Sequence, residues 1–429
     1  MIALTSDAPH CLYAATARPP VRTPPLKGAA RAQVVVVGAG YTGLSTALHL
    51  AERGVAVTVL EAHEPGWGAA GRNGGQVNAG LKHEPDEVEG HLGPVYGPRL
   101  VQLAGDAPEF LFRLVARLRI DCEAFRGGTL RAAYRMRHAA ALEDSVAQWR
   151  RRGAALELLE PDRIASATGA SRYVAACFDP RGGSLNPLSY ARGLAAAALA
   201  AGARIHSDSR ALKLERDGAS WCVTALAGRV RADQLVLATD GYSDDLWPGL
   251  RTSIVPVYSS IVATAPLPPA LAAQVLPSGA VLYEAGDITV YYRKDRDQRL
   301  LMGGRGRQRR ATELTDYAHL VSYARQLWPA LAAIDWTHWW NGQFALTPDF
   351  YPRLHAPAPG LLIALGYSGR GVALATALGA QLADAVTGTA LDTLALPVTG
   401  IPRIPLHGLW RVGVAARLAY GRLLDHIGR

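Results

Sequence analysis

The residues with the clearest chemical purpose are three glycines, Gly38, Gly40 and Gly43, which are spaced as Gly-x-Gly-x-x-Gly. Gly38 permits a tight turn, Gly40 lets the backbone approach a pyrophosphate, and Gly43 lets a helix pack closely on a strand. Glu61 stands 18 residues after Gly43 and can accept hydrogen bonds from both ribose hydroxyls of an adenosine. This spacing predicts a dinucleotide site for either NAD or FAD. NADP is disfavoured, because no Arg or Lys closely follows Glu61 to bind a 2′-phosphate.

The elements around these glycines have the pattern that such a site requires. Residues 34–37 are four consecutive valines, and residues 41–51 carry apolar residues at helical spacing. Gly54 suits a helix C-terminus, and alternating valines at 55–59 predict a second strand. The first turn of the helix would offer backbone N–H groups to a phosphate. Residues 32–61 are therefore predicted to form a strand–helix–strand nucleotide-binding unit.

The composition is that of a globular protein with about two or three domains. Hydrophobic residues make up 49% of the 429 residues and charged residues 19%. The net charge of +9 suits an anionic cofactor, an acidic substrate, an anionic membrane surface or nucleic acid. The four cysteines are widely spaced and predict neither a metal site nor a disulfide, as expected in a reducing cytoplasm. No signal peptide or transmembrane segment is indicated, so a cytoplasmic location is expected.

Strands with a nucleotide-binding pattern are scattered along the chain, with strands of antiparallel character between them. Helices are predicted at 97–121, 138–152, 187–201 and 372–387, and a basic helix at 409–425. Further strands are predicted at 203–207, 210–216, 221–226, 229–232, 234–238, 254–263, 280–284, 288–293, 299–303 and 361–365. This order predicts one discontinuous cofactor domain interleaved with a substrate domain.

Several further motifs point to a known family. They are Gly71–Gln76, Ala238–Tyr242, Trp340–Gln343 with Thr347–Asp349, and Gly366–Gly371, along with Tyr13–Thr16 near the start and Ile404–Leu406 near the end. With the first glycine motif, they resemble the D-amino-acid-oxidase superfamily of FAD-dependent amine oxidoreductases, and most of all the γ-glutamylputrescine oxidoreductase group. The likeness runs through essentially the whole chain in the same order.

The resemblance implies an α/β fold (α+β overall) of the glutathione-reductase or D-amino-acid-oxidase type. A discontinuous Rossmann-like FAD-binding domain is expected at 32–85, 145–245 and 340–398. An interleaved antiparallel-sheet substrate domain is expected at 86–144 and 246–339. Residues 1–31 are expected to be an irregular lead-in, and residues 399–429 a basic tail helix.

The resemblance also implies the residues that hold FAD. Gly38–Gly43 and the loop at 70–76 would lie along the pyrophosphate, Glu61 and Ala62 at the ribose, and the loop at 366–371 at the flavin. The predicted cofactor-binding residues are Gly38, Ala39, Gly40, Tyr41, Thr42, Gly43, Glu61, Ala62, Ala70, Gly71, Arg72, Asn73, Gly74, Gly75, Gln76, Ala211, Leu212, Ala238, Thr239, Gly241, Gly366, Tyr367, Ser368, Gly369, Arg370 and Gly371.

Three departures from the family pattern refine this prediction. Ala70 stands where the family often has Ser, which removes a hydroxyl contact to phosphate. The chain has no cysteine beyond Cys222, so the covalent flavin link of sarcosine-oxidase relatives is excluded and FAD is expected to be non-covalent. The strand at 299–304 lacks the lysine credited with oxygen activation in those relatives, so either O2 or an electron carrier could reoxidise the flavin.

The chemistry implied is removal of a hydride from the carbon next to an amine, followed by hydrolysis of the imine. The predicted catalytic residues are Asn73, Tyr367, Arg370, Tyr291 and Trp340. Tyr258, Arg293, Gln343 and His83 are further candidates for the substrate pocket or its mouth. Arg370 replaces a frequent family histidine, and it could either add positive charge at the flavin and substrate or face solvent at a helix start. Aromatic residues in strands equally suit sheet packing.

Two alternatives to an oxidase of a small-molecule amine stay open. One is an amino-acid dehydrogenase that passes electrons to a quinone or other carrier. The other is an RNA-associated flavoprotein, since tRNA-modifying relatives share the fold and the pI is about 9.5. Because Lys and Arg are dispersed along the chain, no nucleic-acid partner is expected. The oligomeric state is left open.

Overall fold

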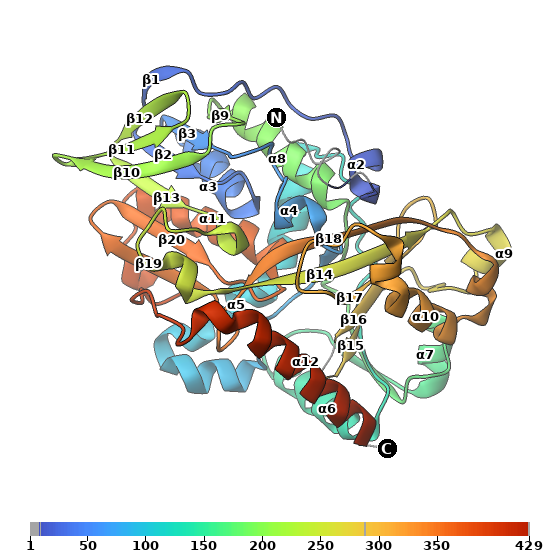
Figure 1. Cartoon of the computed structure of the whole chain (residues 1–429). Helices are drawn as coiled ribbons and strands as arrows, with labels where there is room; N and C mark the ends of the chain where they lie inside the picture. Colours follow the sequence, from blue (N-terminus) through green and yellow to red (C-terminus); the bar gives the residue numbers. More distant parts are fainter. Residues whose placement is uncertain (1–7, 9, 287–288, 428–429) are drawn as a thin grey trace.

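Three large sheets, one two-stranded sheet and the surrounding helices organise the described part of the molecule (Figure 1). The computed structural model describes residues 8, 10–286 and 289–427, with side chains described through Gly421. The predicted strand at 288–293 therefore begins at a residue that lies outside the described part.

A six-stranded sheet carries the nucleotide-binding strands, in the order β19-β20-β13-β2-β3-β9. Five strands run parallel, and β19 pairs antiparallel at one edge. Their bounds are β2 Val34–Val37, β3 Val57–Leu60, β9 Arg204–His206, β13 Gln234–Leu237, β19 Arg353–Ala358 and β20 Leu361–Leu365. Strands buried on both faces explain the uninterrupted valine run of β2.

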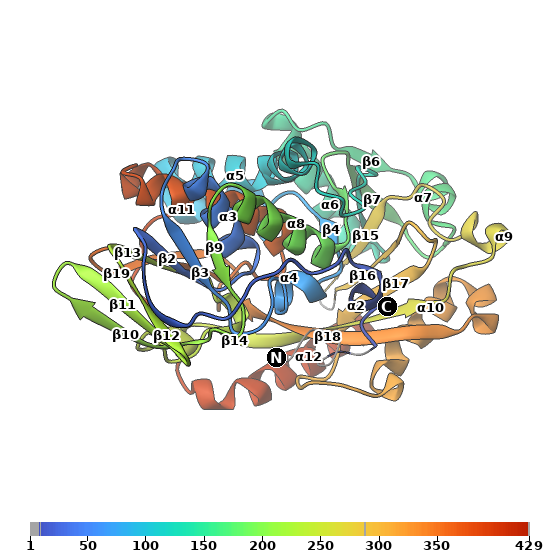
Figure 2. The same ribbon diagram turned by 90° about the horizontal axis from the view of Figure 1, so that it is seen from above.

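The two faces of this sheet are covered by different layers (Figure 2). Val34 and Val36 lie in the hydrophobic cluster of the helices, whereas Val35 and Val37 pack against a second, smaller sheet. The helices are α3 Tyr41–Ala51, α5 Pro85–Leu118, α8 Pro187–Ala200 and α11 Gly371–Val386. Asn186 caps α8, because its side chain accepts from the Ser189 N–H as its position before Pro187 predicts.

The smaller sheet has four strands in the order β1-β12-β11-β10. They are β1 Gly28–Arg31, β10 Ala211–Asp217, β11 Ser220–Ala225 and β12 Gly228–Ala232. Trp221 and Val223 on its inner face pack on the six-stranded sheet. This layer therefore closes the face of the cofactor sheet that the helices leave open.

An eight-stranded sheet forms the other half of the molecule, in the order β18-β14-β17-β16-β15-β5-β7-β6. All neighbours pair antiparallel except β15 and β5. The strands are β5 Thr129–Ala133, β6 Glu157–Leu159, β7 Ala175–Asp179, β14 Val255–Thr264, β15 Val281–Ala285, β16 Val290–Lys294, β17 Leu300–Arg305 and β18 Trp336–Leu346.

Shorter elements complete the described chain. They are the helices α2 Leu12–Thr16, α4 Ala69–Arg72, α6 Met136–Arg151, α7 Pro161–Thr168, α9 Pro269–Ala272, α10 Ala318–Leu327 and α12 Trp410–Ile427, the strands β4 Gln76–Val77 and β8 Gly183–Ser184, and the 3-10 turns η1 Asp240–Tyr242, η2 Leu250–Ser253, η3 Leu314–Tyr317, η4 Pro329–Ala333, η5 Leu391–Thr393 and η6 His407–Leu409.

The sheets divide the chain differently from the expected boundaries. Helix α5 packs with α3 and α11 in the core of the cofactor half, although 86–144 was expected in the substrate domain. Strands β6 and β7 join the eight-stranded sheet, although 145–245 was expected in the cofactor domain. Helical spacing reveals which face of α5 is buried, but it does not reveal which sheet covers that face.

The lead-in is more ordered than the sequence predicts. Its residues 12–16 form α2 and residues 28–31 form β1, which pairs parallel with β12. Cys11, Leu12 and Tyr13 are buried, each at most 1% exposed. The prediction of an irregular lead-in was therefore wrong for these residues, because contacts with distant elements rather than local periodicity stabilise them.

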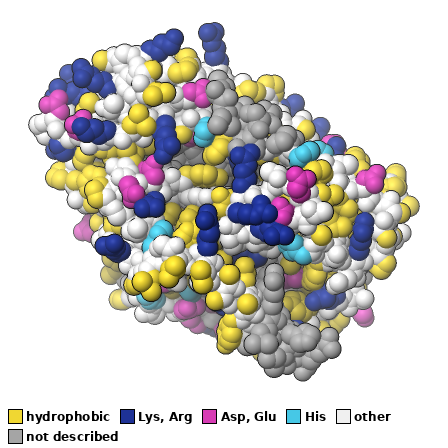
Figure 3. All heavy atoms as spheres, in the orientation of Figure 1, with side chains coloured by type: hydrophobic (Ala, Val, Ile, Leu, Met, Phe, Trp, Pro, Cys, Tyr) yellow, Lys and Arg dark blue, Asp and Glu magenta, His cyan; other side chains and the backbone are white. Residues whose placement is uncertain are grey.

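The tail helix α12 lies on the outside of the molecule (Figures 1 and 2). Val412 and Tyr420 on it, and Leu409 just before it, are more than half exposed. On the face drawn in Figure 3, Lys and Arg side chains are scattered among acidic and apolar ones. Within the described residues, no helix has both the length and the apolar character needed to cross a bilayer.

Candidate active site

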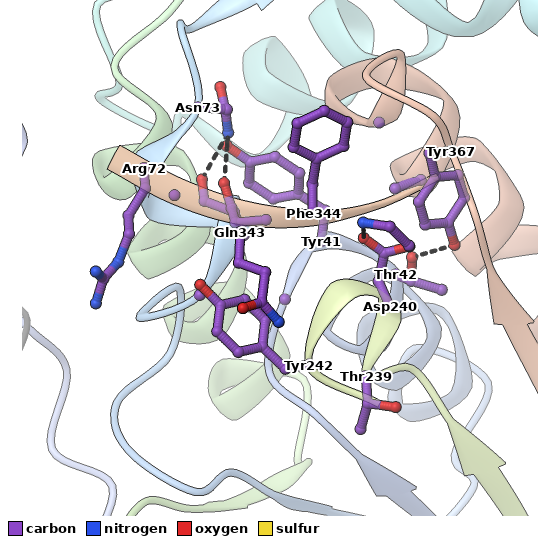
Figure 4. A pocket seen from close by; sticks show the side chains of 18 of the residues that line it. Tyr41, Thr42, Arg72, Asn73, Thr239, Asp240, Tyr242, Gln343, Phe344 and Tyr367 are labelled. Carbon is purple, nitrogen blue, oxygen red and sulfur yellow. Dashed lines mark hydrogen bonds between the residues drawn. The ribbon is translucent and has the colours of Figure 1, made fainter. Parts of the chain in front are cut away.

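A cavity of about 510 Å³ lies where the loops of the six-stranded sheet face the eight-stranded sheet. Residues from β2, α3, α4, η1 and the start of α11 line it, together with residues from β14, β15, β17 and β18. Figure 4 shows Tyr41, Thr42, Asn73 and Tyr367 around this space, with Gln343 and Phe344 crossing it from β18. We call this space the cofactor cavity.

The first glycine motif forms one end of the cofactor cavity, between β2 and α3. Gly38 has φ +105°, and a Cβ there would meet the Ala238 carbonyl O at 2.7 Å. A Cβ on Gly43 would lie 1.9 Å from the Gly38 carbonyl O. At Gly40 the nearest atom to such a Cβ is Ala70 Cβ at 3.8 Å, so the space before the backbone is open. Gly38 and Gly43 are thus needed for close packing of the backbone, whereas Gly40 leaves room for a ligand.

The start of α3 suits an anion. Gly40 is its N-cap and supplies no side-chain hydrogen bond, so the first N–H groups of the helix have no side-chain cap. The helix dipole places partial positive charge at the same point. A pyrophosphate bound at Gly40–Thr42 would satisfy these donors, which is how such helix ends bind phosphate.

Glu61 is held at the end of β3 by backbone donors. The Ala39 N–H donates to its Oε2 at 2.7 Å, and the His63 N–H donates to its Oε1 at 3.0 Å. Burial raises the pKa of this carboxyl above its usual value. Each oxygen keeps a lone pair for a further donor, such as a ribose hydroxyl.

Of the two residues expected beside the adenine, only one reaches the cavity. Ala211 is 6% exposed and lines it, whereas Leu212 is 53% exposed and does not. Neighbouring residues of a strand point to opposite faces, so β10 presents only one of the pair. The Leu212 side chain therefore lies off the cavity wall, and any contact of this residue with the cofactor stays a prediction for its backbone.

The second glycine-rich loop is built by close packing and by Asn73. A Cβ on Gly71 would lie 2.2 Å from the Gly66 carbonyl O. Asn73 Nδ2 donates to the carbonyl oxygens of Ala69 and Ala70 and to Tyr41 Oη, and Asn73 Oδ1 accepts from the Gly75 N–H. Both polar atoms of this amide are therefore bonded, within the loop and to Tyr41 of α3. Asn73 lines the cavity, but its contacts are those of a positioning residue.

Arg72 and Gln76 tie this loop to its surroundings. Arg72 Nε donates to the Trp67 carbonyl O at 2.8 Å, and its guanidinium lies 4.4 Å from the Trp67 ring centroid. Gln76 Nε2 donates to the carbonyl oxygens of Leu282 in β15 and Tyr292 in β16. The loop is therefore joined to both halves of the molecule. Gly75 is not on the cavity wall, because it faces Leu185 and Arg293.

The loop before α11 forms the opposite wall. Tyr367 Oη and Thr42 Oγ1 share a hydrogen bond of 2.5 Å (Figure 4). Asp240 Oδ1 accepts from the Gly366 N–H at 2.8 Å and thereby fixes the loop to η1. Asp240 and Ser368 have φ of +40° and +52°, a strained conformation that is frequent at functional sites. Helix α11 begins at Gly371 with no side-chain cap, so its N–H groups also face the cavity region.

The eight-stranded sheet supplies the remaining wall. Tyr291 lines the cavity and its hydroxyl lies 2.9 Å from Ser259 Oγ, while burial raises its pKa to about 12. Trp340 does not reach the wall: it is 1% exposed, and its Nε1 donates to the Arg72 carbonyl O at 3.0 Å. The structure therefore places Trp340 behind the site, contrary to the prediction of a catalytic residue. Further along β18, the residues that line the cavity are Gly342, Gln343, Phe344 and Ala345.

The other predicted pocket residues divide in the same way. Gln343 lines the cavity and donates to the Gly241 carbonyl O. Arg293 is buried behind the loop, where its Nε donates to the Gly74 carbonyl O at 2.7 Å. Tyr258 is not on the wall, and His83 borders a smaller neighbouring cavity instead.

The remaining predicted cofactor residues are placed as follows. On the wall are Ala39, Tyr41, Thr42, Ala62, Ala70, Gly74, Ala238, Thr239, Ser368, Gly369, Arg370 and Gly371. Gly43, Gly71, Gly241 and Gly366 stand just behind it, where a Cβ would clash with neighbouring atoms. For example, a Cβ on Gly241 would lie 2.6 Å from Phe344 Cα.

Some residues that could contact a ligand line the cavity but were not predicted from the sequence. Among them are Lys82, Tyr283, Arg305 and Phe344. Lys82 follows β4 in a loop and has no periodic pattern around it. The sequence feature that could have drawn attention to Lys82 is the rarity of lysine in this chain, since only four of the 45 Lys and Arg residues are lysine. Burial, together with nearby Arg370 and Arg305, lowers the Lys82 pKa to about 7. Burial also lowers the pKa of Arg305.

Comparison with known proteins identifies the family of this chain. A family model described as "FAD dependent oxidoreductase" (DAO) matches residues 33–385. The chain belongs to this family. Its fold class and its cofactor, FAD, are thereby confirmed, and the protein is an FAD-dependent oxidoreductase.

Relatives of known sequence and structure agree with that assignment. The chain is 32% identical to gamma-glutamylputrescine oxidoreductase of Escherichia coli (strain K12) over 424 residues, which cover 97% of this chain and 98% of the relative. It is also 32% identical to a probable oxidoreductase OrdL of Rhizobium meliloti (strain 1021), over 89% of each chain. The crystal structure of glycine oxidase from Geobacillus kaustophilus shares its fold, with a TM-score of 0.74 at 24% identity, over 86% of this chain and 100% of that one.

The residues present fit FAD. The open space before Gly40, the uncapped start of α3 and the bonded carboxylate of Glu61 suit the diphosphate and ribose. No cysteine lines the cavity, which agrees with non-covalent binding. At the other end, the start of α11 offers partial positive charge, which suits the negative charge of a reduced flavin.

Proposed function

We propose that the protein oxidises an amine of the γ-glutamylputrescine or amino-acid type. A hydride leaves the carbon next to nitrogen, a proton leaves the nitrogen, and the resulting imine takes up water to give an aldehyde or keto acid and an amine. Bound FAD supplies the oxidant by accepting the hydride at N5. The observation that carries this proposal is one cavity, which extends from the dinucleotide motif to an aromatic and cationic wall on the other sheet.

The wall residues favour the reactive form of the substrate. An amine reacts only when neutral, because an ammonium nitrogen has no lone pair to assist hydride loss. Lys82, Arg305 and Arg370 add positive charge to the cavity, and neighbouring positive charge lowers the pKa of a bound amine. Burial raises the pKa of Tyr291 and Tyr367, so both stay neutral hydrogen-bond donors at physiological pH.

Other residues orient rather than react. Gly38–Gly43 and Glu61 would hold the diphosphate and ribose, and the loop at 366–371 would hold the flavin pyrimidine. Tyr291, Phe344 and Tyr283 would then flank the reacting carbon, because they form the wall opposite that loop. Fixing the C–H bond toward the acceptor supplies a large part of catalysis in such reactions.

The test is anaerobic mixing of the purified yellow protein with γ-glutamyl amines, polyamines and amino acids. We expect loss of the oxidised flavin absorption with at least one amine and none with the corresponding alcohol. Absence of bleaching with every amine, in a protein that contains FAD, would refute the proposal.

We infer further that O2 accepts the electrons and is reduced to H2O2 in the cytoplasm, within polyamine catabolism. The name of the relative from Escherichia coli, gamma-glutamylputrescine oxidoreductase, supports the link to polyamines. The competing proposal is an amino-acid dehydrogenase that reduces a quinone or other carrier; the missing lysine at 299–304 favours it. Comparing peroxide release with reduction of a quinone-like dye, at one amine concentration, separates the two.

A further inference from the structure

A second cavity of about 180 Å³ adjoins the cofactor cavity. Five residues border both: Asn78, Lys82, Tyr283, Thr289 and Arg370. We call the second cavity the side chamber and these five residues its junction. The two cavities therefore adjoin at Lys82, Tyr283 and Arg370.

The junction carries unneutralised positive charge. The Arg370 guanidinium lies 4.5 Å from the centroid of the Tyr283 ring, and its Nη1 is buried with no hydrogen-bond partner among the described residues. Lys82 lines both cavities and makes no ion pair within the described part of the chain. This arrangement answers the question left open for Arg370, whose side chain turns to the cavities and not to solvent.

The acidic side chains that line the side chamber already have ion-pair or hydrogen-bond partners within the protein. Glu84 pairs with Arg131 and also accepts from Ser145 Oγ at 2.7 Å. Asp179 pairs with Arg181 at 2.7 Å. Glu284 accepts from the hydroxyls of Tyr173 and Tyr323. Glu84 and Asp179 are thus each neutralised by an arginine, and neither forms an ion pair with Lys82 or Arg370 among the described residues.

An anionic group is the ligand that this arrangement stabilises. A carboxylate accepts hydrogen bonds from a guanidinium and an ammonium together, and such charge-assisted bonds are the stronger kind. A buried guanidinium nitrogen without a partner gains a bond that it otherwise lacks. A second ammonium group, as at the far end of a polyamine, would instead meet like charge from Lys82 and Arg370.

We propose that the junction and side chamber bind a carboxylate carried at the far end of the amine substrate, several bonds from the reacting carbon. The inference rests on the proposed amine oxidation and narrows its substrate class to amines with a remote carboxylate, of which γ-glutamyl amines are one kind. The reacting amine lies in the cofactor cavity, the linking methylenes pass the face of Tyr283, and the carboxylate binds Arg370 and Lys82.

The activity test uses the FAD-loaded protein and two substrates that share one reacting end. N-Glutarylputrescine carries the remote carboxylate without a second ammonium group, and N-acetylputrescine has a neutral cap in its place. We expect kcat/KM for anaerobic flavin reduction to favour the first by about tenfold or more. The variant Lys82→Met should lose most of this ratio, and Lys82→Arg should retain it because the charge is kept. An unchanged ratio in Lys82→Met would overturn the proposal.

A matched control and a binding assay separate this proposal from the proposed function. Lys27→Met removes an exposed lysine of the lead-in and should leave the ratio unchanged. Calorimetry with glutarate, against glutaramide as the neutral analogue, measures carboxylate binding without turnover. Glutarate binding that weakens about tenfold in Lys82→Met supports the chamber even if no amine reduces the flavin. Equal binding of glutarate and glutaramide would overturn it even if amines are oxidised.

Discussion

At the scale of single residues, substitution of Gly40 and of Gly43 should have different effects, although both glycines belong to one motif. A Cβ on Gly43 would lie 1.9 Å from a backbone oxygen, so Gly43→Ala should destabilise the apoprotein by about 3 kcal/mol. A Cβ on Gly40 meets nothing nearer than 3.8 Å and would project toward the ligand. Gly40→Ala should therefore fold normally and bind FAD about tenfold more weakly. Urea unfolding of the apoprotein and FAD titration measure the two effects; equal stability of both variants would contradict the argument.

Lys82 predicts a pH dependence with a definite sign. Burial, Arg370, Arg305 and Arg131 lower its pKa to about 7, while Glu84 is engaged by Arg131. The ammonium is thus present below pH 7 and is lost as the pH rises through that value. Glutarate affinity for the FAD-loaded protein should fall by about tenfold between pH 6 and pH 9. In Lys82→Arg the affinity should stay flat, since a guanidinium does not deprotonate in this range; a parallel fall in that variant would exclude Lys82 as the titrating group.

At the scale of elements, the short helix α2 is predicted to stabilise the back of the site. Tyr13 is 1% exposed, accepts a hydrogen bond from Arg293 Nη2 and packs edge-on against Trp340, with ring centroids 5.0 Å apart. Tyr13→Ala should lower the free energy of unfolding by about 3 kcal/mol, because it leaves a cavity. Tyr13→Phe should lower it by about 1 kcal/mol, since only the hydrogen bond is lost. Tyr420→Ala, on the exposed face of α12, is the control, and a comparable loss there would refute a specific role for α2.

The same elements show how far the sequence could predict this protein. The β2–α3 unit and the loop at 366–371 were predictable from local sequence. Their signals are a run of valines and glycines at positions where a Cβ would clash with the backbone or with neighbouring side chains. Helix α2 was not, since five residues are too few to show a helical period and its stability comes from Trp340 and Arg293. The Lys82 site was not predictable either, because its neighbours come from β15, β17 and the start of α11.

At the scale of the whole molecule, the cofactor cavity is bordered by both halves of the chain, so FAD should stabilise their association. Glu61 belongs to the cofactor half, and Phe344 on β18 belongs to the eight-stranded sheet. On the proposed binding mode, ADP would fill only the end near Gly38–Gly43 and Glu61, whereas FAD would also reach the sheet wall. FAD at about 100 times its Kd should raise stability by about 2.7 kcal/mol, and at one shared concentration it should raise Tm more than ADP does.

Two substitutions test which part of the cavity causes the larger rise in Tm with FAD than with ADP. Glu61→Ala removes a contact that both ligands share, so it should reduce the Tm rise produced by ADP and by FAD. Phe344→Ala alters only the sheet wall, so it should reduce the rise with FAD and leave the rise with ADP unchanged. Differential scanning calorimetry of the apoprotein with each ligand decides the matter. If Phe344→Ala changed both rises equally, the aromatic wall would be acting on the fold and not on the flavin end of the cofactor.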